Sequence, residues 1–395
     1  EIMPSLVGSE MCIRDRKKYY LISILSFILF LIVSMLAYRM DLKQEAQVLA
    51  VGDNLIHPNI YRDALESDGD TYNFNPMYQN IKKDIQSADI AFINQESPIG
   101  GDHRPYHGFK RFNTPSDISD SLVQTGFNFI NGSNNHALDQ GDEGLKYHIQ
   151  QWNKYKNKVL FTGTYDSQKS HDQVAVKKIN GINIAMLSYT FGTNGIKPKH
   201  QYEINYFDDK QIKKDIQQAK EVADVIFVSA HWGNEGSHQP NPIQRKYAKL
   251  FADEGVDVVL GTHPHVIQPV EWIKGKDHHR TLVAYSLGNF LNGQETGNES
   301  NDLLGRIEFK IMKTPKAVKI ENVKWRSMVN YYELSDVYNK NSKENFKIYP
   351  LKDMDERLIR KHGRYYDPNS DMSQLRLKQI TKEVINETFL DDDSF

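Results

Sequence analysis

The chain of 395 residues contains one cysteine, Cys12, and no strong excess of charge of either sign. A single cysteine excludes an intramolecular disulfide and a thiolate-based metal site. A formal net charge of −2 gives no argument for nucleic acid as a partner, and we expect none. The contents of hydrophobic residues (39%) and charged residues (25%) are ordinary for a globular protein, and the length suffices for one large domain with additions.

Long apolar runs are also scarce, with one exception near the N-terminus. Residues 19–38 (YYLISILSFILFLIVSMLAY) carry no charge, and a run of this length spans a bilayer core of about 30 Å. Four basic residues precede the run, so the positive-inside rule predicts a cytoplasmic N-terminus (1–18) and an extracellular main domain. We expect an uncleaved signal-anchor in the cell membrane, because the run is long for a signal peptide and no A-x-A-like site follows.

The remaining organisation follows from changes in pattern along the chain. Residues 1–16 have no periodicity and read like a cloning remnant, so we set them aside as a sequence artefact. Residues 39–46 are a polar linker, residues 47–310 are the main domain, and residues 311–395 are a C-terminal extension of strands followed by a polar tail.

Short runs rich in Val, Ile and Phe predict buried strands, and amphipathic segments between them predict helices. The predicted strands are 47–51, 90–93, 127–130, 182–187, 225–229, 256–260 and 282–285, and the predicted helices are 75–89, 143–156, 209–224 and 241–255. This alternation predicts an α/β fold with a largely buried sheet. Beyond Gly305 apolar and polar residues alternate, which predicts antiparallel strands with one solvent-facing side.

Polar side chains that bind metals follow five of these strands. They are Asp53, Glu96, Asn135 with His136, His231, and His263 with His265. Each one alone reads as an ordinary turn or loop residue, but five in chain order favour a shared site at the carboxyl ends of the strands.

The donor set predicts a two-metal centre. Three oxygen donors (Asp53, Glu96, Asn135) and three imidazoles can hold two divalent cations, which a bridging Glu96 would keep about 3.5–4 Å apart. Mixed nitrogen and oxygen ligation without thiolate suits Mn, Fe or Zn. Two such ions activate water as a nucleophile, and His136 is the candidate catalytic group that protonates a leaving group or binds an oxyanion.

Six motifs carry a resemblance to a known family. They are VGD (51–53), NQESP (94–98), NNHALDQGDEGL (134–145), SAHWGNEG (229–236), THPHVIQPVE (262–271) and YSLGNF (285–290). In this order they resemble the poly-γ-glutamate capsule biosynthesis family (CapA/PgsA type), which is similar to the calcineurin-type metallophosphoesterases. The resemblance covers roughly residues 47–310.

The resemblance implies a metallophosphatase-like αββα sandwich and supports the six metal-site positions named above. It also implies substrate-binding roles for Glu235 and Asn289, and a loop-shaping role for Asp139. Two departures stand out: Leu55 occupies a place where phosphoesterases usually have histidine, and Glu96 stands where they usually have aspartate. His57 is the nearest histidine that could substitute.

Two functions stay open. The first is a membrane-anchored extracellular protein of poly-γ-glutamate capsule biosynthesis or export, whose partners are the membrane-bound synthase subunits and the anionic polymer. Lys110, Arg111, Lys197 and Lys199 are candidate polymer contacts, although they also read as ordinary surface charges. The second is a metal-dependent hydrolase that acts on a phosphoester or amide of a cell-envelope polymer. A purely structural role leaves the strand-end ligands unexplained.

Overall fold

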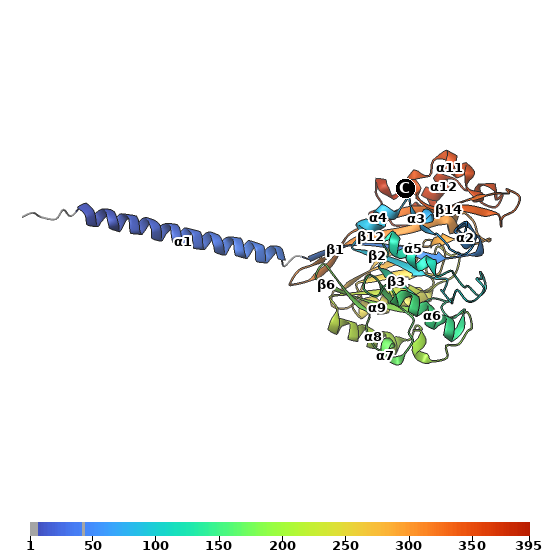
Figure 1. The fold of residues 1–395 in the computed structure, drawn as a ribbon, viewed down its shortest axis with the longest axis horizontal. Helices are drawn as coiled ribbons and strands as arrows, with labels where there is room; N and C mark the ends of the chain where they lie inside the picture. Colours follow the sequence, from blue (N-terminus) through green and yellow to red (C-terminus); the bar gives the residue numbers. More distant parts are fainter. Residues whose placement is uncertain (1–6, 42–43) are drawn as a thin grey trace, which may run out of the picture.

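The structure, a computed structural model, describes residues 7–41 and 44–395. Its first element is one long helix, α1 (Val7–Asp41), which extends from the body of the molecule (Figure 1). Residues 18–35 of this helix have a mean hydropathy of 2.0, and none of this window is buried against the rest of the chain. By length and composition α1 is therefore long and apolar enough to cross a membrane. Part of the segment taken as an artefact (1–6) and part of the predicted linker (42–43) lie outside the described residues.

The body consists of two mixed sheets. The first has the order β14 (Lys343–Pro350), β13 (Val318–Leu334), β12 (Leu303–Lys313), β1 (Gln44–Leu55), β2 (Ile90–Gln95), β3 (Phe129–Asn131) and β4 (Leu160–Thr162), and β11 (Asn289–Asn292) also pairs with β1. The second has the order β5 (Val176–Ile179), β6 (Ile182–Thr190), β7 (Val225–His231), β8 (Val258–Thr262), β10 (Arg280–Ala284) and β9 (Val270–Lys274). Strands β1 to β4 run parallel, as do β6, β7, β8 and β10, so their carboxyl ends share an edge in each sheet.

The alternation of side chains along the strands explains the layers. Val48 and Ala50 of β1 pack in one apolar cluster with Phe227 and Leu260 of the second sheet. Leu49, from the same strand, points the other way into a cluster shared with helices. Each sheet is therefore apolar on both faces, and its outer face is covered by helices. The predicted αββα arrangement is confirmed.

The helices cover the two outer faces (Figure 1). Over the first sheet lie α3 (Asn75–Tyr78), α4 (Lys82–Ser87) and α5 (Asp117–Thr125), and over the second lie α8 (Asp209–Val222) and α9 (Pro242–Asp253). The main body also contains α2 (Pro58–Asp63), α6 (Gly141–Asn153), α7 (Gln168–His171), α10 (Glu299–Asp302) and the short 3-10 helix η1 (Gln201–Glu203). The single helix predicted over 75–89 is wrong, since two short helices occupy this range, and α5 was not predicted.

The C-terminal region is built into the main body. The boundary predicted at residue 310 falls inside β12, and β13 and β14 extend the first sheet. The segment predicted as a polar tail contains β14, α11 (Glu356–Lys361), α12 (Gln374–Val384) and the short 3-10 helices η2 (Leu351–Asp353), η3 (Gly363–Tyr366), η4 (Glu387–Phe389) and η5 (Asp392–Ser394). Buried Met354, Leu377 and Phe389 anchor this segment in the apolar cluster between the sheets. The division at residue 310 is therefore wrong as a structural boundary, because the strands on either side of it share one core.

Candidate metal centre

The loop after β8 presents two imidazoles in an unusual backbone conformation. His263 has a φ of 96° and His265 a φ of 59°, both in the left-handed region that non-glycine residues seldom occupy. Pro264 lies between them, and the Asn289 side-chain amide donates to the His265 carbonyl over 3.2 Å. Backbone strain of this kind persists only where the surroundings hold it, and it concentrates at functional sites.

Asp53 is the anchor of the site on β1. Its Oδ2 accepts a hydrogen bond from the backbone N–H of His263 over 3.1 Å and lies 3.1 Å from Nδ1 of His265. Its Oδ1 accepts from the Asn94 side chain on β2 over 2.7 Å. The backbone at Asp53 also pairs with Asn289 of β11. Asp53 therefore ties the histidine loop of one sheet to the strands of the other.

Glu96 is the least satisfied polar group of the site. Its carboxylate is completely buried, and neither oxygen has a hydrogen-bond partner within residues 7–41 and 44–395. One oxygen lies 3.6 Å from Nε2 of His231 and 3.8 Å from Nε2 of His265. Burial, and then the neighbouring Asp53, raises the pKa of Glu96 well above its ordinary value. A buried carboxylate without donors is costly unless a cation accompanies it.

Three imidazoles surround this carboxylate, and burial holds two of them, His231 and His263, in the neutral form. Burial and the neighbouring rings lower the pKa values of His231 and His263 well below that of free histidine. Nδ1 of His231 lies 2.9 Å from the Thr262 hydroxyl, which fixes that ring. Nδ1 of His263 is buried and has no partner in the part of the chain that the structure describes. Neutral imidazoles with one free nitrogen are the form in which histidine binds metals.

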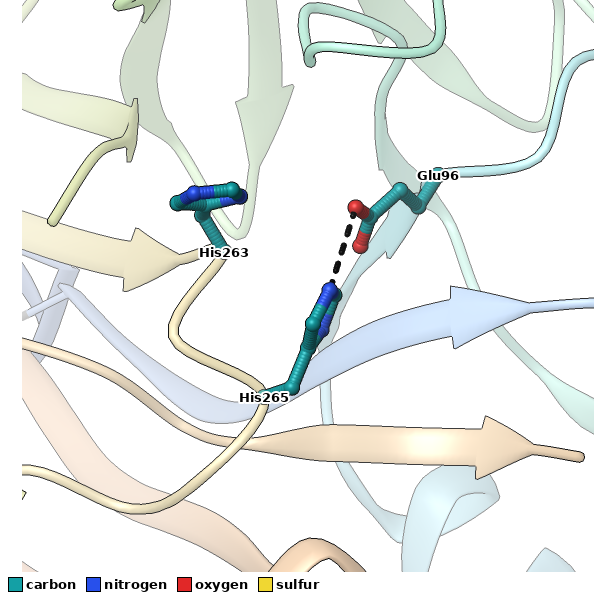
Figure 2. A group of neighbouring side chains, drawn as sticks. All are labelled: Glu96, His263 and His265. Atoms are coloured by element: carbon teal, nitrogen blue, oxygen red, sulfur yellow. Dashed lines mark ion pairs between the residues drawn. The ribbon is translucent and has the colours of Figure 1, made fainter. Parts of the chain in front are cut away.

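Among the described residues, two groups of side chains have donor atoms close enough to hold a metal ion. Asp53, Glu96 and His231 form one, Glu96, His263 and His265 form the other, and in each group the donor atoms lie within 4.8 Å of one another. Figure 2 shows Glu96 and His265 pointing toward one another, with His263 across from them. Glu96 belongs to both groups, which is the position that a bridging ligand would occupy. The unpartnered oxygens of Glu96 and the free Nδ1 of His263 fit a divalent cation.

Asn135 and His136 lie at the rim of this cluster. Oδ1 of Asn135 is 2.8 Å from Nε2 of His231, so the amide faces the metal-binding groups. Nδ1 of His136 is 2.8 Å from Oδ2 of Asp139, and the same oxygen accepts the backbone N–H of Phe112. Asp139 thus orients the His136 ring, in addition to the loop-shaping role that the resemblance implied.

The other predicted residues belong to neither group of metal donors. Asn289 is buried behind the loop and holds the His265 carbonyl, whereas Glu235 is exposed on the loop after β7. His57 belongs to neither group, and its Nδ1 lies 3.0 Å from the Leu55 carbonyl and 3.2 Å from the N–H of Gly293. Burial lowers the pKa of His57 to about 3. A structural role for His57 agrees with these contacts.

Four site residues were not predicted from the sequence. Asn94 bonds to Asp53 and Thr262 to His231, while Asn194 lies 3.3 Å from Nδ1 of His136. Phe191 is half exposed over the site, with its ring centroid 4.5 Å from that of His263. Asn94 begins the NQESP motif and Thr262 the THPHVIQPVE motif, so both could have been predicted from the sequence. Phe191 and Asn194 belong to a loop with no signal in the sequence, so only the fold brings them to the site.

A shallow groove of about 570 Å³ adjoins Asp139. Its basic lining residues are Arg104, His107, Lys110 and Arg111. The last three are exposed and make no ion pair among the described residues, whereas Arg104 pairs with Glu143 at 2.8 Å. The other two candidate polymer contacts, Lys197 and Lys199, do not line this groove. The groove therefore carries a local positive charge beside the His136–Asp139 pair.

Comparison with known proteins identifies relatives. Residues 47–294 match the family of bacterial capsule synthesis proteins PGA_cap, which confirms the resemblance noted in the sequence. The PGA biosynthesis protein CapA of Bacillus subtilis is 29% identical over 222 residues, and the capsule biosynthesis protein CapA of Bacillus anthracis is 27% identical over 234 residues. These alignments cover 55% and 56% of this chain and 57% and 55% of the relatives, so the match spans little more than half of each protein.

Solved structures give weaker likenesses. A phosphatase of Mycoplasma pneumoniae aligns with 72% of this chain and 94% of its own, at 13% identity and a TM-score of 0.44. The calcineurin-like phosphoesterase YfkN of Bacillus subtilis aligns with 72% of this chain and 90% of its own, at 15% identity and a TM-score of 0.40. At these sequence identities and TM-scores, the two likenesses say nothing about the activity of this chain.

Proposed function

Because the chain belongs to the bacterial capsule synthesis family PGA_cap, we propose that it is a membrane-anchored extracellular protein of poly-γ-glutamate capsule biosynthesis or export that holds divalent metal. The anchor is α1, with the N-terminus in the cytoplasm, as its basic flank suggests. The partners are the membrane-bound synthase subunits and the anionic polymer. The relatives' names, which refer to PGA and capsule biosynthesis, support this role.

One observation carries the metal part of the proposal: the fully buried Glu96 carboxylate has no hydrogen-bond partner among the described residues and lies among the imidazoles of His231, His263 and His265. Asp53, Glu96, His231, His263 and His265 would hold two ions, with Asn135 as a sixth donor. Manganese, iron or zinc suits this nitrogen and oxygen set. When bound, such ions supply Lewis acidity and lower the pKa of water.

The groove beside Asp139 supports the polymer part. Lys110 and Arg111 at its edge offer unpaired positive charge, and an extended polycarboxylate gains from several such contacts at once. We expect Lys110→Ala/Arg111→Ala to weaken poly-γ-glutamate binding several-fold at low salt, with the difference shrinking as the salt concentration rises. The control is Lys274→Ala/Lys276→Ala, which removes two exposed lysines far along the chain. Equal losses in both variants would refute a role for the groove.

A second function, hydrolysis of a phosphoester or amide in a cell-envelope polymer, is favoured by the His136–Asp139 pair. Asp139 holds Nδ1 of His136, which leaves the other ring nitrogen to give a proton to a leaving group. Phe112 packs edge-on against the imidazole with 4.8 Å between ring centroids and limits its rotation. If the protein is a hydrolase, His136→Gln should abolish turnover of poly-γ-glutamate or a phosphoester without changing the metal content.

The experiment that tests the metal centre is elemental mass spectrometry of the full-length protein purified in detergent. The His263→Ala/His265→Ala variant is compared with His200→Ala/His278→Ala, which removes two exposed imidazoles. We expect about one or two transition-metal ions per chain, lost only in the first variant. A parent protein that binds no metal even after addition of manganese or zinc would refute the proposal.

The capsule role has its own test. Deletion of the gene in its host should lower the amount of extracellular poly-γ-glutamate, and the full-length protein should copurify from membranes with the synthase subunits. Unchanged polymer after deletion would refute the capsule role while leaving the metal centre unaffected.

A further inference from the structure

A second cavity, of about 200 Å³, lies in the C-terminal part of the body. It is lined by the end of β13, the start of β14, the loop between them and η3, together with Glu295. All of these residues follow residue 294, where the family match ends. None of them belongs to the metal-binding groups. The cavity is therefore independent of the site described above.

Two cationic side chains that line this cavity are almost completely buried. Lys343 is 7% exposed and Arg364 is 3% exposed. The Lys343 ammonium donates to the carbonyls of Gly293 and Gln294 and lies 4.4 Å from the ring centroid of Tyr332. Its contacts are thus carbonyl dipoles and an aromatic face. Buried lysine is rare unless it is paired, so this arrangement calls for an explanation.

Arg364 is only partly satisfied. Its Nε donates to Oδ2 of Asp302 over 2.8 Å and its Nη1 to the Gly297 carbonyl over 3.0 Å. Its Nη2 is buried without any partner among the described residues. Asp302 is the one fully buried carboxylate beside the two cations, and it already serves Arg364 and the Asn330 amide. A buried donor without a partner is what an incoming oxyanion would satisfy.

The electrostatic surroundings of Lys343 also favour an anionic ligand. Burial lowers the pKa of Lys343 to about 8; Asp302 opposes this effect, and the neighbouring Arg364 adds to it. The ammonium is therefore under-compensated by the protein alone. The nearby carboxylates are already paired, Asp302 with Arg364 at 2.8 Å and Asp367 with Lys340 at 2.9 Å, whereas Lys343 makes no ion pair among the described residues. The carboxylate of a ligand would supply the anionic partner that Lys343 lacks.

The mouth of the cavity is apolar and aromatic. Tyr338 is 95% exposed, and Val337 and Tyr366 are also exposed. All three line the cavity, together with the side chain of Leu334. Large exposed aromatic side chains beside a concave polar site are typical of ligand recognition. A ligand with a ring or other apolar body would cover them.

We propose that this cavity binds a small organic carboxylate, with the carboxylate at Lys343 and Arg364 and an apolar or aromatic body against Tyr338 and Tyr366. The volume equals about seven water molecules at about 30 Å³ each, so the ligand is of the size of benzoate. The acidic Glu295 and Asp367 disfavour a dianion such as phosphate. The site adds a small-molecule function to the C-terminal region that neither the metal centre nor the groove requires.

The test is calorimetric titration of the full-length protein in detergent with benzoate. Benzamide is the neutral probe of the same shape, and inorganic phosphate is the probe for a simple oxyanion. We expect saturable binding of one benzoate per chain, at least about tenfold weaker binding of benzamide, and no tighter binding of phosphate. Lys343→Met should weaken benzoate binding about tenfold or more, because the charged donor is lost.

Three further variants locate the site. Lys347→Met, on the same strand but not lining the cavity, should bind benzoate as the parent does. His263→Ala/His265→Ala should also bind it unchanged, which excludes the metal centre as the source of the signal. Tyr338→Ala alters a side chain that is too exposed to support the fold, so its expected several-fold loss of affinity tests the site even if Lys343→Met does not fold.

Several results would overturn the proposal. They are no saturable benzoate binding at millimolar concentrations, equal binding of benzamide, tighter binding of phosphate than of benzoate, and an unchanged affinity in a folded Lys343→Met variant. If that variant does not fold, an unchanged affinity in Tyr338→Ala overturns it as well.

Discussion

Replacing Glu96 by glutamine should change protein stability in opposite directions with and without metal. Glutamine has the same shape but no charge, so the change removes a buried, unpartnered carboxylate. Without metal the parent bears the unfavourable burial of this group, which is worth about 1–3 kcal/mol. We therefore expect Glu96→Gln to unfold at the same temperature as the parent, or a few degrees higher, in a chelating buffer.

With metal bound, the parent should unfold at a higher temperature than Glu96→Gln. A ligand at about 1,000 times its Kd stabilises the folded state by about 4 kcal/mol. Glu96 belongs to both metal-binding groups, so we take its loss to weaken metal binding about a hundredfold. At the same metal concentration the stabilisation of the folded state by metal then falls to about 1.4 kcal/mol. An unfolding entropy of about 2.1 cal/mol/K per residue over about 350 residues gives about 0.7 kcal/mol per degree. The metal-induced rise in Tm should therefore fall from about 6 °C to about 2 °C.

The assay is differential scanning calorimetry of the full-length protein in EDTA and then in a series of manganese concentrations. Glu221→Gln on α8 is the matched control, because it removes a carboxylate that is exposed and outside both groups. The control should keep the full metal-induced shift. If Glu96→Gln lowers the Tm in EDTA by several degrees and keeps the parent's response to manganese, Glu96 is a structural acid and the metal-centre reasoning is wrong.

Three further predictions concern other parts of the chain. Burial lowers the pKa of His362 to about 4, so the stability that its neutral ring contributes is intact above the ordinary histidine pKa of about 6.5 and is lost as pH falls toward 4. In urea titrations over this pH window, the free energy of unfolding of His362→Gln should fall by about 3 kcal/mol less than that of the parent. Equal decreases in the two proteins would refute the assignment. Gly52→Ala would place a Cβ 1.8 Å from the backbone carbonyl oxygen of Gly288, before β11, so we expect the free energy of unfolding to fall by about 2 kcal/mol or more and bound metal to be lost. Gly192→Ala, whose Cβ would meet no described atom within 4 Å, should melt like the parent. Lys17→Cys in a cysteine-free background should react with a membrane-impermeant maleimide only in permeabilised cells, whereas Lys276→Cys in the same background should react in intact cells; labelling of Lys17→Cys in intact cells would contradict a cytoplasmic N-terminus.

Most strands of the main body could be read from the sequence. Runs such as 182–187 and 225–229 are almost wholly apolar because β6 and β7 are buried on both faces, and such runs are hard to mistake. The first and last residues of the helices were harder to read from the sequence than those of the strands. The 75–89 segment has helical spacing, but its chain turns between Tyr78 and Lys82, and amphipathic spacing alone does not reveal such a break.

The C-terminal region was harder to predict. β14 was missed because its apolar residues are few, and its place in the sheet comes from antiparallel pairing with β13, the strand that precedes it in the chain. The cavity around Lys343 and Arg364 likewise has no motif, since its two cations come from β14 and η3 and meet only through the fold.

The sequence by itself determined the α/β pattern, the apolar N-terminal helix and the set of strand-end donors, because periodicity and residue type are local properties. It could not determine which donors share a site. Asp53 on β1 and His265 after β8 are 212 residues apart, and only the packing of the two sheets brings their atoms to 3.1 Å. Nor could it reveal that Glu96 has no partner, because burial and hydrogen bonding depend on every neighbour at once. The tertiary structure decided both, and with them which residues can act together.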